Sequence, residues 1–77
     1  MKRHELKIEP QYYSAVLAGV KTFEIRRNDR DFKIGDEILL TEFVPEENRY
    51  TNRELLKQIT YITDYAQKDG YVVMGIK

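Results

Sequence analysis

The sequence lacks several residue types and patterns on which whole classes of function depend. It contains no cysteine, so disulfide bonds, a thiol nucleophile and thiolate metal ligands are excluded for this chain. His4 is the only histidine, which argues against a histidine-based metal site and against a serine–histidine nucleophile pair. No apolar run approaches the roughly 18 residues of a membrane span, and no signal-peptide segment follows Met1. We therefore expect a cytoplasmic protein with no membrane association, no metal and no cofactor.

The chain also lacks net charge, because 13 lysines and arginines balance 13 aspartates and glutamates. This balance argues against a polybasic nucleic-acid tail or a membrane-surface anchor. The charges are nevertheless segregated along the chain. Residues 19–33 carry five cations and three anions, whereas residues 34–47 carry five acids and no base. With 77 residues and no linker or internal repeat, we expect one domain spanning residues 1–77 with a small core.

Hydrophobic periodicity predicts about five strands. They are expected at residues 3–8, 22–27, 37–43, 54–62 and 71–76. Residues 53–57 also fit a helical turn, so strand and helix both stay open there, and residues 45–52 are expected to form a polar loop. In so short a chain, five strands are best arranged as a sheet that curls into a closed barrel, because closure removes the exposed edge strands. The predicted fold is mainly β (α+β), a small barrel of about five strands with one short helix.

That helix is expected to begin at Pro10 and to run for about two turns. Its apolar stripe comprises Tyr13, Val16 and Leu17 at i, i+3 and i+4. Gly19 follows the last periodic residue and is expected to terminate the helix. Elsewhere, His4 is expected at the surface near a strand end, and residues 35–36 are expected in a turn.

Three charged residues stand together after this helix. Glu24 and Arg26 are two positions apart on a predicted strand and therefore share a face, and Lys21 lies where the chain enters that strand. Such a group can bind a phosphate and orient a base or a ribose hydroxyl. The alternative is a surface strip of ion pairs, each contributing about 0–1 kcal/mol. Spacing alone favours the surface strip.

Residues 19–26, Gly-Val-Lys-Thr-Phe-Glu-Ile-Arg, match the G-x-K-x-x-E-x-R signature of the ASCH (activating signal cointegrator homology) domain at all four defined positions. The flanking sequence agrees, with a short helix before the signature and Phe32-x-x-Gly35-Asp36 and a hydrophobic strand after it. The chain most resembles a small uncharacterised bacterial and phage branch. That branch begins with His-Glu-Leu-Lys, as residues 4–7 do, and closes on Gly-Tyr-Val-Val, as residues 70–73 do. The resemblance spans nearly the whole chain.

The resemblance implies a PUA-like fold, a small twisted barrel with a helix over a cleft that binds RNA or a modified nucleoside. It implies that Lys21 and Arg26 contact phosphate or a polar base edge. Glu24 would order these two cations or accept hydrogen bonds from a base. Together with the segregated charges, this predicts a small, localised site for one or a few nucleotides.

Three further residues are candidates for the same surface. Arg27 and Arg30 can extend it, or they can pair with Asp29 or Asp31 instead. Tyr50 lies in a polar segment and can stack a base, although a half-buried tyrosine with a wet hydroxyl is the more common situation.

Two other functions stay open. Some proteins of this family are small amidohydrolases that deacetylate a modified cytidine with a lysine, a threonine and a glutamate. Lys21 matches that lysine, but Glu24 occupies the place of the threonine and Thr22 lies two positions earlier. The family's catalytic glutamate belongs to a later segment without a counterpart here, so hydrolysis, with these three residues as candidates, is the second expectation. The third is a regulatory accessory that interacts with an unknown protein partner.

Overall fold

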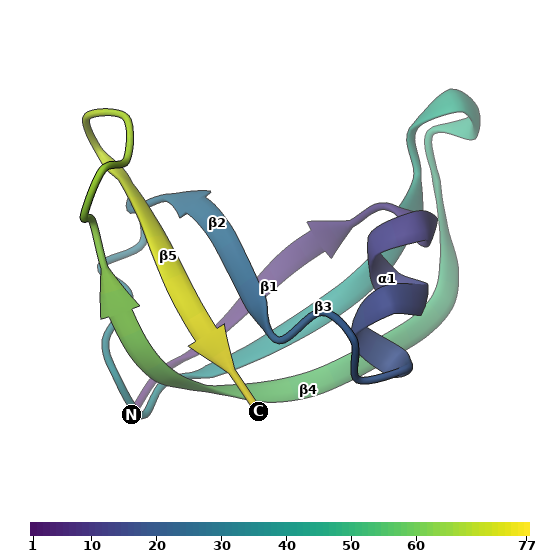
Figure 1. Ribbon diagram of the computed structural model, residues 1–77. Helices are drawn as coiled ribbons and strands as arrows, with labels where there is room; N and C mark the ends of the chain where they lie inside the picture. The colour runs from purple at the N-terminus through teal and green to yellow at the C-terminus, as the bar shows by residue number, and fades with distance from the viewer.

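The computed structural model describes all 77 residues and shows one strongly curved sheet of five strands with a single short α-helix beside it (Figure 1). In chain order the elements are β1 (Arg3–Ile8), α1 (Pro10–Leu17), β2 (Phe23–Arg27), β3 (Glu37–Val44), the 3-10 turn η1 (Pro45–Glu47), β4 (Arg49–Thr63) and β5 (Tyr71–Ile76). The mainly β composition and the position of the helix confirm the prediction. No helix has the length and apolar character needed to cross a membrane.

The strands lie in the order β1-β3-β4-β5-β2. β1 runs parallel to β3, and the other three pairs are antiparallel. The 15-residue β4 pairs with β3 through its first part and with β5 through its second, so it sweeps through both halves of the sheet (Figure 1). Two register shifts mark bulges, and in both the extra residues lie on β4: between Glu54 and Tyr50 opposite β3, and between Ile59 and Tyr61 opposite β5. Bulges bend a strand and increase its twist, which accounts for the curvature.

The expected closed barrel is wrong, because β1 and β2 remain the two edges of the sheet. Carbonyl groups alternate in direction along a strand, and Lys2 O accepts the Glu37 N–H on the β3 side. The carbonyl groups of Glu5 and Lys7 in β1 therefore point away from β3. Two arginine side chains reach them: Arg26 Nη2 donates to Lys7 O at 2.6 Å, and Arg30 Nη1 donates to Glu5 O at 2.5 Å. Side chains thus bridge the edges where a barrel would have a backbone ladder.

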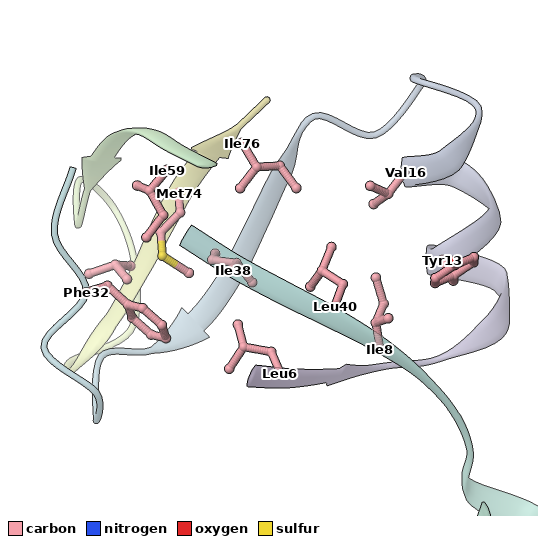
Figure 2. Packing of buried hydrophobic residues seen from close by; sticks show 11 residues of the cluster. Leu6, Ile8, Tyr13, Val16, Phe32, Ile38, Leu40, Ile59, Met74 and Ile76 are labelled. Carbon is pink, nitrogen blue, oxygen red and sulfur yellow. The ribbon is translucent and has the colours of Figure 1, made fainter. Parts of the chain in front are cut away.

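The hydrophobic core lies within the curve of the sheet and beneath α1 (Figure 2). Ile38, Leu40 and Met74 are fully buried at its centre. Tyr13 and Val16 of α1 are buried as predicted, but Leu17 is 56% exposed, which corrects the predicted stripe. Successive helical residues are rotated by about 100°, so a helix that packs along its Tyr13–Val16 line turns Leu17 toward solvent.

The β3–β4 hairpin is longer than the sequence indicated. Residues 49–52, expected in a loop, begin β4, and residues 53–57 are strand and not helix. β3 and β4 pair as far as Val44 and Arg49, so only a short connection remains, with Asn48 in the left-handed conformation at φ 48°. Backbone groups of β3 form the hydrogen bonds of these polar residues, and local sequence does not predict pairing with a distant strand.

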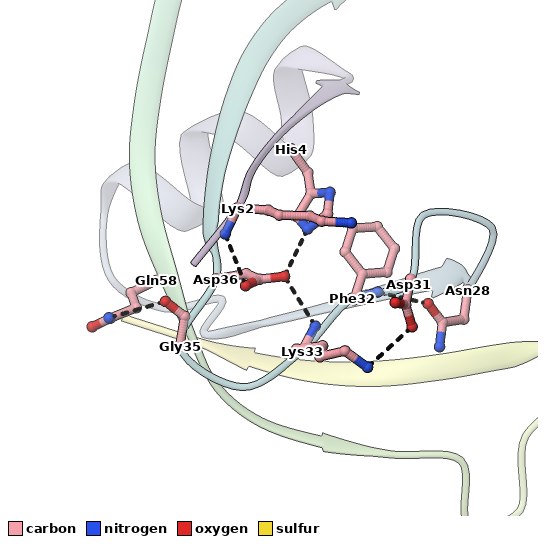
Figure 3. A network of polar contacts seen from close by, with 9 residues as sticks. All are labelled: Lys2, His4, Asn28, Asp31, Phe32, Lys33, Gly35, Asp36 and Gln58. Atoms are coloured by element: carbon pink, nitrogen blue, oxygen red, sulfur yellow. Dashed lines mark hydrogen bonds and ion pairs between the residues drawn. The ribbon is translucent and has the colours of Figure 1, made fainter.

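His4 and Asp36 form a buried pair (Figure 3). The burial of His4 corrects its expected position at the surface, whereas the turn expected at residues 35–36 is confirmed, because the Asp36 N–H donates to Lys33 O at 3.0 Å. His4 Nε2 lies 2.9 Å from Asp36 Oδ2 and donates to it. The backbone N–H groups of Lys2 and Lys33 donate to the same carboxylate, at 3.1 and 3.2 Å. Asp36 thereby fastens the start of β1 to the segment that leads into β3. The hydrogen bond from His4, followed by that from the Lys2 N–H, lowers the pKa of Asp36 to about 2.

Because Asp36 is ionised in the folded protein, we expect the free energy of unfolding to fall in acid. The pKa of Asp36 is lower in the folded protein than its ordinary value of 3.8, so folding favours the ionised form. The resulting stabilisation is present above about pH 4 and is lost as the pH falls from about 4 to about 2. Thermal unfolding of the wild type and of Asp36→Asn should therefore differ most above about pH 5, and the difference should shrink as the pH falls from about 4 to about 2. A difference that stays constant between about pH 6 and about pH 2 would contradict this role.

Candidate functional site

A groove of about 480 Å³ lies at the open edge of the sheet, between β2 on one side and the β1–α1 junction on the other. Nine residues line it: Lys7, Ile8, Glu9, Tyr12, Lys21, Phe23, Glu24, Ile25 and Arg26. The three signature side chains singled out from the sequence are all among them. The groove exists because β1 and β2 do not pair, so the departure from a closed barrel is what creates the cavity.

Glu24 is the buried centre of this site. Only 4% of the residue is exposed, although it lies on an edge strand. Its Oε1 accepts a hydrogen bond from Lys21 Nζ at 2.6 Å, and its Oε2 accepts one from Arg26 Nε at 3.0 Å. The surface strip favoured by spacing alone is therefore wrong, whereas the shared face of Glu24 and Arg26 is confirmed. A buried carboxylate needs such partners, since a lone buried charge is strongly unfavourable.

The local sequence explains how these side chains converge. Gly19 adopts the left-handed conformation at φ 79°, and its N–H donates to Val16 O while the Val20 N–H donates to Ala15 O. This arrangement is a Schellman motif, which confirms the predicted helix end. The Lys21 N–H also donates to Ala15 O at 3.1 Å. The chain reverses direction after α1, and this bond holds Lys21 next to the C-terminal turn of the helix.

Strand alternation then sets the direction of the neighbouring side chains. Glu24 points inward, so Phe23 and Ile25 point outward and are 43% and 51% exposed. A strand normally turns its apolar side chains toward the core. In β2 the charged Glu24 is buried instead, because Lys21 and Arg26 pair with it, and the apolar Phe23 and Ile25 are exposed.

Several donors remain free to meet a ligand. Lys21 Nζ has three N–H donors and uses two, on Glu24 and on Phe23 O at 2.7 Å. Arg26 has five and uses one on Glu24 and one on Lys7 O. One donor on Lys21 and three on Arg26 are left. The Glu24 carboxylate itself is too buried to serve as an acceptor for a base, so its role is to fix the two cations.

Two aromatic rings lie beside Lys21. Tyr12, on the first turn of α1, is 49% exposed, and its ring centroid lies 5.8 Å from Lys21 Nζ. The Phe23 ring lies 4.9 Å from the same nitrogen. Sequence reasoning missed Tyr12 and Lys7 as lining residues. The available signal for Tyr12 was its position next to the buried Tyr13, on the helix that leads into the signature.

The other predicted residues lie outside the groove. Thr22 is exposed and only its carbonyl is engaged, by the Ile76 N–H, so the three candidate catalytic residues are not assembled. Arg27 lies 5.2 Å from the ring centroid of Tyr71. Arg30 bridges to β1 as described above, and its Nε lies 4.0 Å from Asp29 Oδ1. Tyr50 lies on the β3–β4 hairpin. The structure thus brings Lys21, Glu24 and Arg26 together and leaves these four residues apart from them.

Comparisons with known proteins place the chain in a family. It is 35% identical over 74 residues to the "Uncharacterized 12.9 kDa protein in GpA 3'region" of Escherichia phage P2. The similarity covers 95% of this chain and 66% of the phage protein. Residues 3–76, which include every strand and the helix, match the family described as "Domain of unknown function (DUF3850)". Because this match extends over almost the entire domain, the chain belongs to the DUF3850 family.

Proposed function

We propose that the groove binds a nucleotide, either free or as part of RNA, without catalysing a reaction on it. The observation that carries the proposal is the buried carboxylate of Glu24, which holds Lys21 and Arg26 in place while four of their N–H donors stay free. Cations fixed in this way bind a phosphate or the polar edge of a base without first having to be ordered. The resemblance of residues 19–26 to the ASCH signature supports the same conclusion.

The size and composition of the groove fit this ligand. Small-molecule sites generally measure about 300–1,000 Å³, and this one measures about 480 Å³. Its lining includes three cations and two carboxylates, one of which is already paired with Lys21 and Arg26. A base stacked on the exposed ring of Tyr12 would place its phosphate near these donors. Stacking of one base on an aromatic side chain contributes about 1–3 kcal/mol.

Tyr12→Ala provides the cleanest test, because this ring is not part of the Glu24 network. We expect the wild type to bind nucleoside monophosphates or short RNA, and Tyr12→Ala to weaken binding by about 1–3 kcal/mol while thermal unfolding changes little. Isothermal titration calorimetry over a panel of the four ribonucleotides measures the effect. The matched control is Tyr65→Ala, which removes a tyrosine that is 84% exposed and outside the groove.

Two results would contradict the proposal. One is the absence of binding by the wild type across the whole panel at millimolar ligand. The other is equal affinity of Tyr12→Ala, Tyr65→Ala and the wild type, which would show that the groove is not the binding site.

A further inference from the structure

Lys7 differs from the other cations of the groove in having no partner for its charge. Lys21 and Arg26 are both paired with Glu24, whereas Lys7 Nζ forms neither an ion pair nor a hydrogen bond. It lies instead over two aromatic rings, 4.4 Å from the centroid of Phe43 and 5.8 Å from that of Tyr50. Lys7 therefore stands at the boundary between the groove and a second surface, which we term the hairpin platform and define as Phe43 and Tyr50.

The register of the sheet explains this position. Lys7 pairs with Thr41 across the parallel β1–β3 ladder, so Phe43, two residues further along β3, lies on the same face. Phe43 in turn pairs with Tyr50 across the antiparallel β3–β4 ladder. The outer face of the sheet therefore carries Lys7, Phe43 and Tyr50 as neighbours, from the edge strand that borders the groove to the hairpin.

The hairpin platform is held in place and open to solvent. The ring centroids of Phe43 and Tyr50 are 5.0 Å apart at an interplanar angle of 65°, an edge-to-face packing that orients the tyrosine. Tyr50 is nevertheless 49% exposed. Beyond it, η1 presents the exposed Glu46 and Glu47. Glu47 is paired with Arg49, so the carboxylate that repels a phosphate backbone and limits how far a strand can extend is that of Glu46.

We propose that the ligand is a single-stranded nucleic acid of at least two nucleotides, with one base in the groove, the next stacked on Tyr50 and the linking phosphate at Lys7. The inference rests on the proposed function of the groove and specifies its ligand. Single-strand binding proteins combine a cation that follows the backbone with aromatic rings that stack successive bases. Here Lys7, an unpaired cation on the strand that borders the groove, lies 5.8 Å from the ring centroid of Tyr50 on the hairpin, and Tyr12 lines the same groove as Lys7.

The test compares ligands of increasing length. Calorimetry with uridine monophosphate, the dinucleotide and the trinucleotide, in ribose and deoxyribose forms, should show an affinity gain of about 5- to 150-fold from one nucleotide to two. The third nucleotide should add little. Tyr50→Ala should abolish the gain and leave mononucleotide binding unchanged. Tyr61→Ala, which removes a 63% exposed tyrosine elsewhere on β4, should keep the gain. The ribose and deoxyribose series distinguish RNA from single-stranded DNA as the source of the ligand.

Lys7→Gln gives an independent readout. Removing one phosphate contact should lower the slope of log affinity against log salt concentration for the dinucleotide by about 0.7. Equal affinity for one and two nucleotides, or a gain that survives Tyr50→Ala, would overturn the inference and leave the groove as a mononucleotide site. If neither ligand binds the wild type, the proposed function itself fails.

Discussion

Replacing both Lys21 and Arg26 with methionine should lower the free energy of unfolding by about 3–5 kcal/mol, because the Glu24 carboxylate would then remain buried without a partner. The two hydrogen bonds to Glu24, at 2.6 and 3.0 Å, disappear together, and so does the bridge from Arg26 to Lys7 O. A chain of this length has a total stability of only about 4–12 kcal/mol. The double variant should therefore lose a large fraction of its total stability and unfold at a markedly lower urea concentration than the wild type.

A third substitution separates the burial of a charge from the loss of packing. Adding Glu24→Gln to the double variant removes the unpaired charge and should restore a large part of the lost stability, since a neutral amide costs less to bury than a carboxylate. Urea denaturation followed by circular dichroism measures all three species. A double variant within about 1 kcal/mol of the wild type would show that Glu24 is solvated in solution.

The same series bears on function. The folded triple variant lacks the free donors of Lys21 and Arg26 but retains the groove and Tyr12. Loss of nucleotide binding in this variant is therefore attributable to the missing donors. Single charge reversals at Lys21 or Arg26 would not separate loss of ligand binding from loss of stability, because each also removes an ion pair with the buried Glu24.

Leu40→Ala should destabilise the protein by about 2–5 kcal/mol. Leu40 is fully buried on β3, where its side chain lies among Leu6, Ile8 and Ile38 and beneath α1 (Figure 2). Truncation removes apolar contact and leaves a cavity, because the surrounding strands and helix collapse only in part. The core has only 11 buried apolar residues, so few others can compensate. Thermal and urea unfolding measure the effect.

Leu56→Ala is the matched control for this prediction. It makes the same substitution on the neighbouring strand β4, at a leucine that is 47% exposed. We expect a loss of less than about 1 kcal/mol, as for other partly exposed apolar residues. Similar losses for Leu40→Ala and Leu56→Ala would indicate that the curved sheet does not enclose a distinct core.

Local sequence was sufficient for the elements whose pattern is self-contained. β1 and β5 have the predicted bounds, and α1 begins at Pro10 and ends at the Gly19 turn. The alternation that puts Glu24 and Arg26 on one face is confirmed, because the side-chain period of a strand does not depend on its neighbours. The predictions failed where a segment's structure depends on neighbouring strands. The first residues of β4 are polar and became a strand only because β3 supplies their backbone partners.

Burial of polar residues was the second source of error. His4 was expected at the surface and Asp36 only in a turn, yet the two are buried and pair with each other inside the fold. Glu24 is buried for the same kind of reason, since its two cationic partners compensate for the loss of water. Whether a charge can be buried depends on what surrounds it in space, and residues far apart in the chain supply part of that environment.

The mainly β class, the single short helix and the spacing of Lys21, Glu24 and Arg26 follow from local sequence. That β1 and β2 stay unpaired, and that a groove lined by Tyr12 and Lys7 opens between them, is evident only in the folded chain. Pairing of two strand edges depends on which hydrogen-bond partners distant segments offer, and local sequence does not contain that information. At this edge, the side chains of Arg26 and Arg30 satisfy carbonyl groups that a barrel would have joined to β2.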